Sequence, residues 1–370
     1  MHRFAADFPF LEQATYLNTA AESLLPRRAH AALARYADDK ARGERGRSAL
    51  YAVEQDCRVR LASLLGVPPA DVAFVASTAR AIDAVVQALP WQPGDNLVTD
   101  DLEFPTTIFA ALRLGGRGIE PRIVRGRRGV FTPEDVAVRV DSRTRLVCVS
   151  LVSFHSGLRL DLAHLADLVH ARGALLLVDV AQAAGAVPVD GAAADFLVGC
   201  AFKWLLGAHG AGFLVVRSQT AGHLEPSYVG WRSVRDLFAP DRLERYQLWP
   251  DARRFEEGSP AYTALYVLAD SLAFVEEVGL TEVFARIEDL AGLAAGGLRR
   301  LGINPLTPEE PGARAGIIAF ETPDCARIVA ELAARGVYVW GRDGRVRLSP
   351  HFYNESADVA CFVSALAEFV

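Results

Sequence analysis

The stretch that decides the fold is Leu175-Leu176-Leu177-Val178-Asp179-Val180-Ala181-Gln182, which is followed later by Cys200-Ala201-Phe202-Lys203-Trp204-Leu205-Leu206-Gly207. The first stretch is an apolar run that ends in a carboxylate, as a buried strand of an open α/β sheet does. In the second stretch a lone amine follows another apolar run, although the chain has few lysines. A carboxylate and an amine at two strand ends suit a ligand that needs an anion at one point and an amine at another.

Apolar runs of strand length recur on both sides of these two stretches. They predict strands at 72–76, 96–99, 122–124, 146–150, 174–178, 196–199 and 212–216. Helical periodicity lies between them, at 79–89, 107–114, 132–140 and 162–171. Because the strands are almost continuously apolar, we expect helices on both faces of a mainly parallel sheet, which is an α/β fold.

A segment rich in proline and aromatic residues, 224–260, ends this alternation. Helical pattern returns at 261–278 and 281–301, and the later pattern predicts a smaller α+β unit built from 316–320, 326–335, 337–339, 346–348 and 356–369. We therefore expect a large α/β domain over 16–258, and a small α+β domain formed by 1–15 together with 259–370.

The composition excludes several classes of protein. The 370 residues are 51% hydrophobic and carry a net charge of −6, with arginines interspersed among acidic residues, so a nucleic-acid-binding face is not indicated. No apolar stretch is long enough to span a bilayer, and the first residues lack the apolar core of a secretion signal. The five cysteines are widely spaced without metal-ligand pairing, so we expect no metal site and a cytoplasmic location.

Asp179 and Lys203 suit pyridoxal 5′-phosphate (PLP). The carbonyl of this cofactor forms a Schiff base with a lysine, and its ring nitrogen binds a carboxylate. Gln182, three residues after Asp179, is placed to donate to the 3′-oxygen of the ring. The structural alternative for Asp179 is a cap on the next helix.

Two strand ends earlier in the chain supply further candidates for cofactor binding. Ser77, Thr78 and Ala79 follow a strand and open a helix, where free N–H groups and the helix dipole favour a phosphate; the alternative is an ordinary N-cap. Phe104 follows the next strand and is a candidate to stack on the cofactor ring, the alternative being core packing.

Four other residues are candidates on weaker patterns. His155 follows the strand at 146–150 and is a candidate acid or base, or merely polar lining. Trp231 and Ser259 have donors for a phosphate, although turn and interface packing explain both equally well. Arg347 alternates with apolar residues along a strand and is a candidate clamp for a carboxylate, or a surface residue.

In this order, these residues resemble the class V aminotransferase family of fold-type I PLP-dependent enzymes, over nearly the whole chain. The most specific motifs are Asp179-x-x-Gln182, Lys203 with Gly207-Ala208-His209-Gly210, Glu257-Gly258-Ser259-Pro260 and Arg347-Leu348-Ser349-Pro350-His351-Phe352-Tyr353-Asn354. The last motif is most similar to the isopenicillin N epimerase-like and C–S lyase-like branch, and Phe104-Pro105-Thr106 is similar to the kynureninase-like branch.

The resemblance implies a role for each candidate. Lys203 holds the cofactor and moves the Cα proton, Asp179 pairs with the ring nitrogen and Gln182 with the 3′-oxygen. Thr78 and Ala79 hold the phosphate, with Trp231 and Ser259 of a second subunit, and Phe104 stacks on the ring. Arg347 receives the substrate α-carboxylate, near Asn18 and Ala20 of the N-terminal segment. The family resemblance implies a homodimer with shared active sites.

Two departures from the family pattern shape the expected activity. Phe202 stands before the lysine where a hydrogen-bonding residue is usual, so phosphate binding depends more on the backbone and a partner subunit. The segment 337–347 holds no cysteine, and Cys325 and Cys361 lie in helical patterns, so we expect an enzyme other than a cysteine desulfurase.

The leading hypothesis is therefore an enzyme that acts at the Cα of an α-amino acid through an external aldimine, with transamination as the default outcome. C–S lyase activity by β-elimination, or epimerisation or cyclisation, are the alternatives on the same scaffold. A binding or regulatory protein without catalysis is a further hypothesis, because Ala201 and Phe202 have no hydrogen-bonding groups. An NAD enzyme is disfavoured, since Ser77-Thr78-Ala79 has no glycine.

Overall fold

The computed structural model describes residues 3–4 and 6–370. Its centre is a seven-stranded sheet with strand order β2-β8-β7-β6-β5-β3-β4. These strands are β2 (Val72–Val75), β3 (Asn96–Asp100), β4 (Glu120–Val124), β5 (Thr144–Ser150), β6 (Leu175–Asp179), β7 (Phe196–Cys200) and β8 (Gly212–Val216). All neighbours are parallel except β8, which runs antiparallel to both β2 and β7. The predicted mainly parallel sheet is thus confirmed, strand for strand.

Helices cover both faces of this sheet, and alternate residues of every strand except the edge strand β4 enter two different cores. In β6, Leu176 and Val178 belong to one core and Leu177 to the other, as the two-residue period of a strand requires. One face packs against α3 (Thr78–Ala88) and α4 (Pro105–Gly115). The other packs against α2 (Arg47–Leu65), α5 (Pro133–Ala137), α6 (Leu162–His170) and α8 (Tyr262–Val278).

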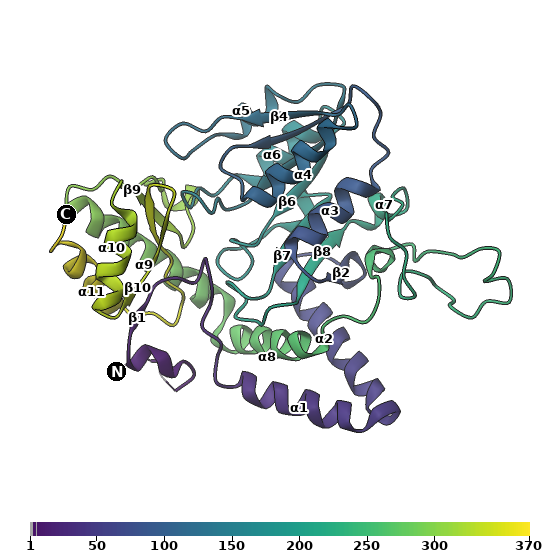
Figure 1. The fold of residues 1–370 in the computed structure, drawn as a ribbon, viewed down its shortest axis with the longest axis horizontal. Helices are drawn as coiled ribbons and strands as arrows, with labels where there is room; N and C mark the ends of the chain where they lie inside the picture. The colour runs from purple at the N-terminus through teal and green to yellow at the C-terminus, as the bar shows by residue number, and fades with distance from the viewer. Residues whose placement is uncertain (1–2, 5) are drawn as a thin grey trace.

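The helices α1 (Ala29–Ala41) and α2 were not predicted from the sequence. In α1 the buried residues are two alanines, Ala29 and Ala32, so its apolar periodicity is weak. Both helices lie against α8 (Figure 1). The expected domain boundary at residue 258 would place α8 in the small domain and its packing partners α1 and α2 outside it. This boundary stays a proposal.

The smaller part of the molecule lies at the left of Figure 1. It contains α9 (Leu280–Arg300), β9 (Ile318–Glu321), α10 (Cys325–Ala334), β10 (Val337–Tyr338), β11 (Trp340–Arg342), β12 (Arg345–Leu348) and α11 (Ser356–Leu366). Strands β11, β12 and β9 form an antiparallel sheet, and β10 pairs in parallel with β1 (Thr15–Tyr16). The N-terminal rings of Phe4 and Phe8 contact Phe352 of this part and Phe274 of α8. The N-terminal segment therefore joins the two parts.

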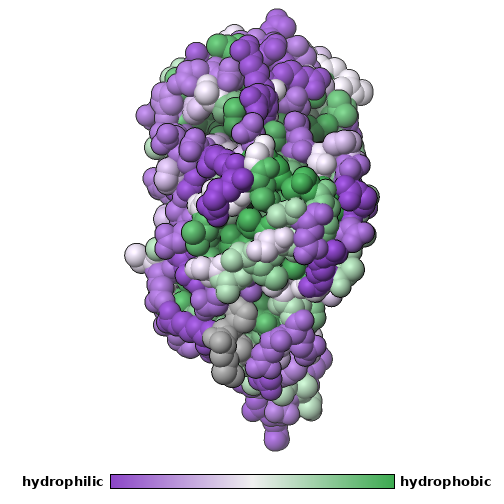
Figure 2. Space-filling model, turned by 90° about the vertical axis from the view of Figure 1, so that its left-hand side faces the viewer, coloured by the Kyte–Doolittle hydropathy of each residue, from purple (hydrophilic) through white to green (hydrophobic). Residues whose placement is uncertain are grey.

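Short helices complete the chain: α7 (Ser218–Ala221), η1 (Pro9–Glu12), η2 (Gly43–Gly46), η3 (Pro69–Asp71), η4 (Gly191–Ala193), η5 (Ala252–Phe255) and η6 (Pro311–Ala313). Figure 2 views the molecule from the side of the smaller part, where hydrophilic residues cover most of the face and apolar residues gather near its middle. Within residues 3–4 and 6–370, every helix is too short or too polar to cross a membrane.

Candidate active site

A cavity of about 380 Å³ opens at the carboxyl ends of the central strands. Three neighbouring strands end at its wall, β5 at Ser150, β6 at Asp179 and β7 at Cys200. Ligands of open α/β sheets bind at such strand ends. Of the predicted site residues, this cavity is lined by Ala20, Ser77, Thr78, Ala79, Phe104, Asp179, Gln182, Lys203 and Arg347.

Asp179 lies at the floor of the cavity and is 8% exposed. Its Oδ1 accepts one hydrogen bond, from the backbone N–H of Ala181 at 2.7 Å. Burial raises the pKa of Asp179 to about 6, against the opposing effects of that N–H and of the Lys203 charge. A cation placed beside this carboxylate would therefore recover the free energy lost on its burial.

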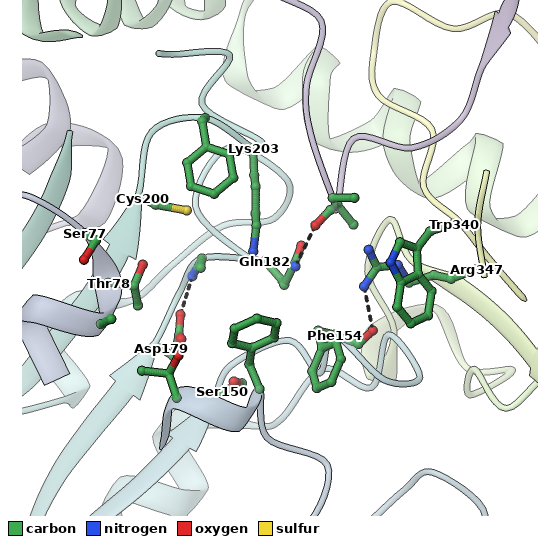
Figure 3. Close-up of a pocket in the computed structure, with 17 residues that line it drawn as sticks. Ser77, Thr78, Ser150, Phe154, Asp179, Gln182, Cys200, Lys203, Trp340 and Arg347 are labelled. Carbon is green, nitrogen blue, oxygen red and sulfur yellow. Dashed lines mark hydrogen bonds between the residues drawn. The ribbon is translucent and has the colours of Figure 1, made fainter. Parts of the chain in front are cut away.

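Lys203 enters the cavity from the loop after β7 (Figure 3). Its Nζ lies 5.7 Å from the ring centroid of Phe104 and 5.6 Å from that of Phe202. Lys40, on the exposed side of α1, is the other lysine of the chain. The loop that carries Lys203 is tightly packed, because a Cβ at Gly207 would lie 2.7 Å from the Cβ of Ala201.

Gln182 is held at both ends of its amide. Its Nε2 donates to the carbonyl of Ala20 at 3.0 Å, and its Oε1 accepts from Nε1 of Trp204 at 2.7 Å. An amide nitrogen carries two hydrogens, so one remains for a ligand. Trp204 thereby sets the orientation of the amide, a contact that the sequence did not indicate.

Ser77, Thr78 and Ala79 form the start of α3 on the far side of the cavity from Arg347 (Figure 3). Ser77 is the N-cap, and its side chain accepts from the N–H of Arg80 at 3.2 Å. The first N–H groups of a helix have no partner inside it and attract anions. Gly212 in β8 allows this approach, since a Cβ there would lie 2.7 Å from the backbone of Ser77.

Arg347 closes the opposite end of the cavity. It is 3% exposed, its Nη1 donates to the carbonyl of Phe154 at 3.0 Å, and its Nε has no hydrogen-bond partner. Among the residues that the structure describes, no carboxylate pairs with it. Burial, together with the nearby Arg345, lowers the pKa of Arg347 to about 9. A buried guanidinium without a partner anion has the donors and the charge that a carboxylate requires.

Four predicted residues do not line this cavity. His155 lies beside Phe154, and burial and the charge of Arg345 lower its pKa to about 4. The backbone of Asn18 forms an isolated parallel β-bridge with Ser349, and its buried side-chain Oδ1 has no hydrogen-bond partner. Trp231 and Ser259 lie at separate surface cavities of this chain. Their predicted roles stay predictions.

Phe154 also lines the cavity, as expected for the loop 154–156 in the substrate pocket, whereas Trp340, Ser150 and Cys200 were not predicted. Trp340 comes from β11, directly opposite Arg347 in the register, and its ring lies 4.8 Å from the Cζ of that arginine. Ser150 is bound through its hydroxyl to the buried Glu103 at 2.9 Å. The strand-end position of Ser150 was the available signal, whereas Trp340 reaches the cavity only through the pairing of β11 with β12.

The match to a family model covers residues 15–362, with the description aminotransferase class-V. The chain belongs to the class V aminotransferase family. The sequence is 27% identical to an uncharacterized aminotransferase of Bacillus subtilis, YcbU, covering 97% of this chain and 95% of the relative. It is 30% identical to isopenicillin N epimerase of Amycolatopsis lactamdurans, covering 84% and 83%.

Solved structures of the same shape correct one expectation. A cysteine desulfurase from Thermococcus onnurineus aligns with a TM-score of 0.90 and 25% identity, over 99% of this chain and 97% of that one. A complex of the cystine C–S lyase C-DES aligns with a TM-score of 0.90 and 25% identity, over 98% and 99%. The expectation that the enzyme is not a cysteine desulfurase was therefore wrong. Cys325 and Cys361 do lie in α10 and α11, but the lack of a loop cysteine does not separate this class V chain from desulfurases.

PLP, the cofactor predicted from the sequence, is the cofactor of this family. The cavity fits it on three observations. Phe104 is 50% exposed at the cavity wall, Asp179 has one backbone partner for a buried carboxylate, and an anion-binding helix start faces the same space. Among the described residues, no group of three or more His, Cys, Asp or Glu side chains is placed to hold a metal ion.

Proposed function

We propose that this class V enzyme uses PLP to act at the Cα of an α-amino acid. The observation that carries the proposal is Arg347, a buried guanidinium without a carboxylate partner among the described residues, in the same cavity as Lys203 and Asp179. An α-amino acid supplies the missing carboxylate to Arg347. When bound, PLP withdraws electrons from the Cα of the amino acid.

The predicted residues of the cavity then have the following roles. Asp179 and Gln182 hold the pyridine ring, and the start of α3 holds the phosphate. Arg347 orients the substrate through its carboxylate, and the amine of Lys203 removes a proton from Cα and returns it. Phe104 covers the ring and excludes water from it.

Transamination is the proposed default outcome, because the relative from Bacillus subtilis is an aminotransferase by name and matches 97% of this chain. The second candidate is β-elimination or desulfuration of a sulfur-containing amino acid. The alignment with a cystine C–S lyase and a cysteine desulfurase favours it. Epimerisation is supported by the 30% identity to isopenicillin N epimerase.

We also propose that two copies share their active sites. Trp231 and Ser259 do not line the cavity of their own chain, so we place them at the phosphate site of a second copy, where each would donate a hydrogen bond to the phosphate. Trp231 is 46% exposed, as a residue that awaits a partner would be. A cytoplasmic location stays part of this proposal.

The two lysines of the chain provide a sharp test. The protein is incubated with PLP, reduced with borohydride and mapped by peptide mass. We expect the pyridoxyl mass at Lys203 and not at Lys40, and loss of the visible absorbance of bound PLP in Lys203→Ala but not in Lys40→Ala. A tag at Lys40 alone, or no tag, would refute the proposal.

Product analysis then separates the outcomes. The holoenzyme is mixed with a panel of amino acids, with and without a keto-acid acceptor. Acceptor-dependent keto-acid formation indicates transamination, and release of pyruvate and ammonia together with a thiol or sulfide indicates elimination. Formation of alanine from cysteine with transfer of sulfur to an added thiol indicates desulfuration, and loss of optical rotation without any of these products indicates epimerisation.

A further inference from the structure

Beside Arg347, the cavity has an aromatic wall of Phe104, Phe154 and Trp340, of which the proposed reaction uses Phe104 alone. Phe104 and Phe154 meet edge to face, with ring centroids 5.3 Å apart and an angle of 81° between the rings. Trp340 continues the wall on the far side, where its ring lies against Arg347 (Figure 3). The carbonyl of Phe154 accepts from Arg347, so Phe154 and Trp340 both border the point where a substrate carboxylate would bind.

The ionisable groups that line the cavity are already engaged. Lys203 and Asp179 serve the cofactor, and Arg347 serves the α-carboxylate. The thiol of Cys200 stays neutral, because burial raises its pKa. Among the described residues that line the cavity, none is left as an ionic partner for a substrate side chain.

Two polar side chains of the cavity are held by protein partners as well. The hydroxyl of Ser150 is bound to Glu103, and Gln182 is bound at both ends, with its remaining amide hydrogen assigned to the cofactor. A charged substrate side chain in this space would lose its hydration without gaining a partner of opposite charge, which is unfavourable.

Arg345 is the next cation, two residues before Arg347 on the same face of β12, but it does not line the cavity. Its Cζ lies 5.4 Å from the ring centroid of Phe154 and 5.4 Å from that of Trp340. Its Nη2 lies 4.0 Å from a carboxylate oxygen of Asp343. Arg345 therefore packs against both rings and contributes no lining to the cavity.

We infer that Phe154 and Trp340 form the subsite for the substrate side chain, and that this subsite takes an aromatic or large apolar side chain rather than an acidic or basic one. The inference rests on the proposed function, since it takes Arg347 as the carboxylate site. An aromatic side chain can contact both rings at once, whereas the methyl group of alanine reaches neither fully.

The test is a titration of the holoenzyme with L-phenylalanine, L-leucine, L-alanine, L-aspartate and L-arginine, followed by the absorbance of the cofactor. We expect phenylalanine to bind about tenfold or more tightly than alanine, aspartate and arginine, with leucine between. This matches the 10- to 200-fold discrimination that apolar pockets reach.

Two variants and a control locate the preference. Trp340→Ala and Phe154→Ala are each expected to weaken phenylalanine binding by about tenfold more than they weaken alanine binding. Both residues contact Arg347, so a loss common to the two amino acids reports on Arg347, and the difference between the two losses reports on the side-chain subsite. Phe109→Ala, on α4 and 66% exposed outside the cavity, is expected to change neither.

Tighter binding of aspartate than of phenylalanine would overturn the inference and point to Arg345. Equal binding of all five amino acids would overturn it too, while leaving the proposed function standing. If no amino acid changed the absorbance of a holoenzyme tagged at Lys203, the proposed function itself would fail.

Discussion

Replacing Arg347 with methionine tests the site through two effects of opposite sign. Methionine is about as long as arginine, but it removes the charge and all donors. Arg347 is 3% exposed, and its hydrogen bond is to a neutral carbonyl rather than a carboxylate. We expect the variant to bind amino acids much more weakly and to unfold less readily.

The loss of affinity follows from the buried position. Truncating one partner of a buried, hydrogen-bonded charge pair costs about 2–5 kcal/mol. At about 1.36 kcal/mol per factor of ten, KM for the amino acid should rise roughly 30-fold to several thousand-fold. A substrate analogue without a carboxylate should be affected little.

The gain in stability follows from the same burial. The pKa of Arg347 falls from 12.5 to about 9, which corresponds to an upper limit of roughly 5 kcal/mol lost on burying the charge. The hydrogen bond to Phe154 offsets about 1.5–3 kcal/mol of this. The apoprotein of Arg347→Met should therefore gain at most about 2–3.5 kcal/mol of unfolding free energy.

Steady-state kinetics and chemical denaturation of the apoprotein measure the two effects. Arg345→Met is the matched control, because Arg345 lies on the same strand and is buried but does not line the cavity. With alanine as substrate, its KM should change by less than about threefold. A KM for Arg347→Met within threefold of the wild type, or an equal rise in Arg345→Met, would refute the carboxylate role.

Two further predictions concern the cofactor site. Because burial raises the pKa of Asp179 to about 6, above its value of 3.8 when exposed, its stabilising contribution is present below about pH 4 and is lost as pH rises through 6. The apoprotein of Asp179→Asn should therefore lose less stability between pH 4 and pH 7 than the wild type, by at most about 3 kcal/mol; parallel stability curves would contradict this. Gly212→Ala should weaken PLP binding by about tenfold or more, because its Cβ would lie 2.7 Å from the backbone of Ser77. Gly115→Ala is the control, because a Cβ at Gly115 would have no atom within 4 Å, and it should leave the PLP affinity unchanged in a fluorescence titration. Equal PLP affinities of the two variants would exclude a role of the α3 start in binding the phosphate.

The strands of the large sheet were predictable because all except the edge strand β4 are largely buried and read as short, mostly apolar runs. The start of α3, the end of β6 and the lysine loop followed from that pattern, since parallel strands bring their carboxyl ends to one edge. The same reasoning failed for α1, whose buried residues are small. It also failed for the reaction type. Because the segment 337–347 has no cysteine, we expected an enzyme other than a cysteine desulfurase, yet a cysteine desulfurase has the same fold.

The sequence by itself determined the fold class, the family and the chemical groups at the cofactor site, because these depend on local patterns and on single reactive side chains. Only the tertiary structure decided which side chains contact one another around these groups. Trp340 meets Arg347 through strand pairing, Phe154 meets Phe104 across two loops, and Trp204 orients Gln182. These contacts join side chains from different strands and loops, and their partners are set by strand pairing and by the packing of loops at the edge of the sheet rather than by any local sequence pattern.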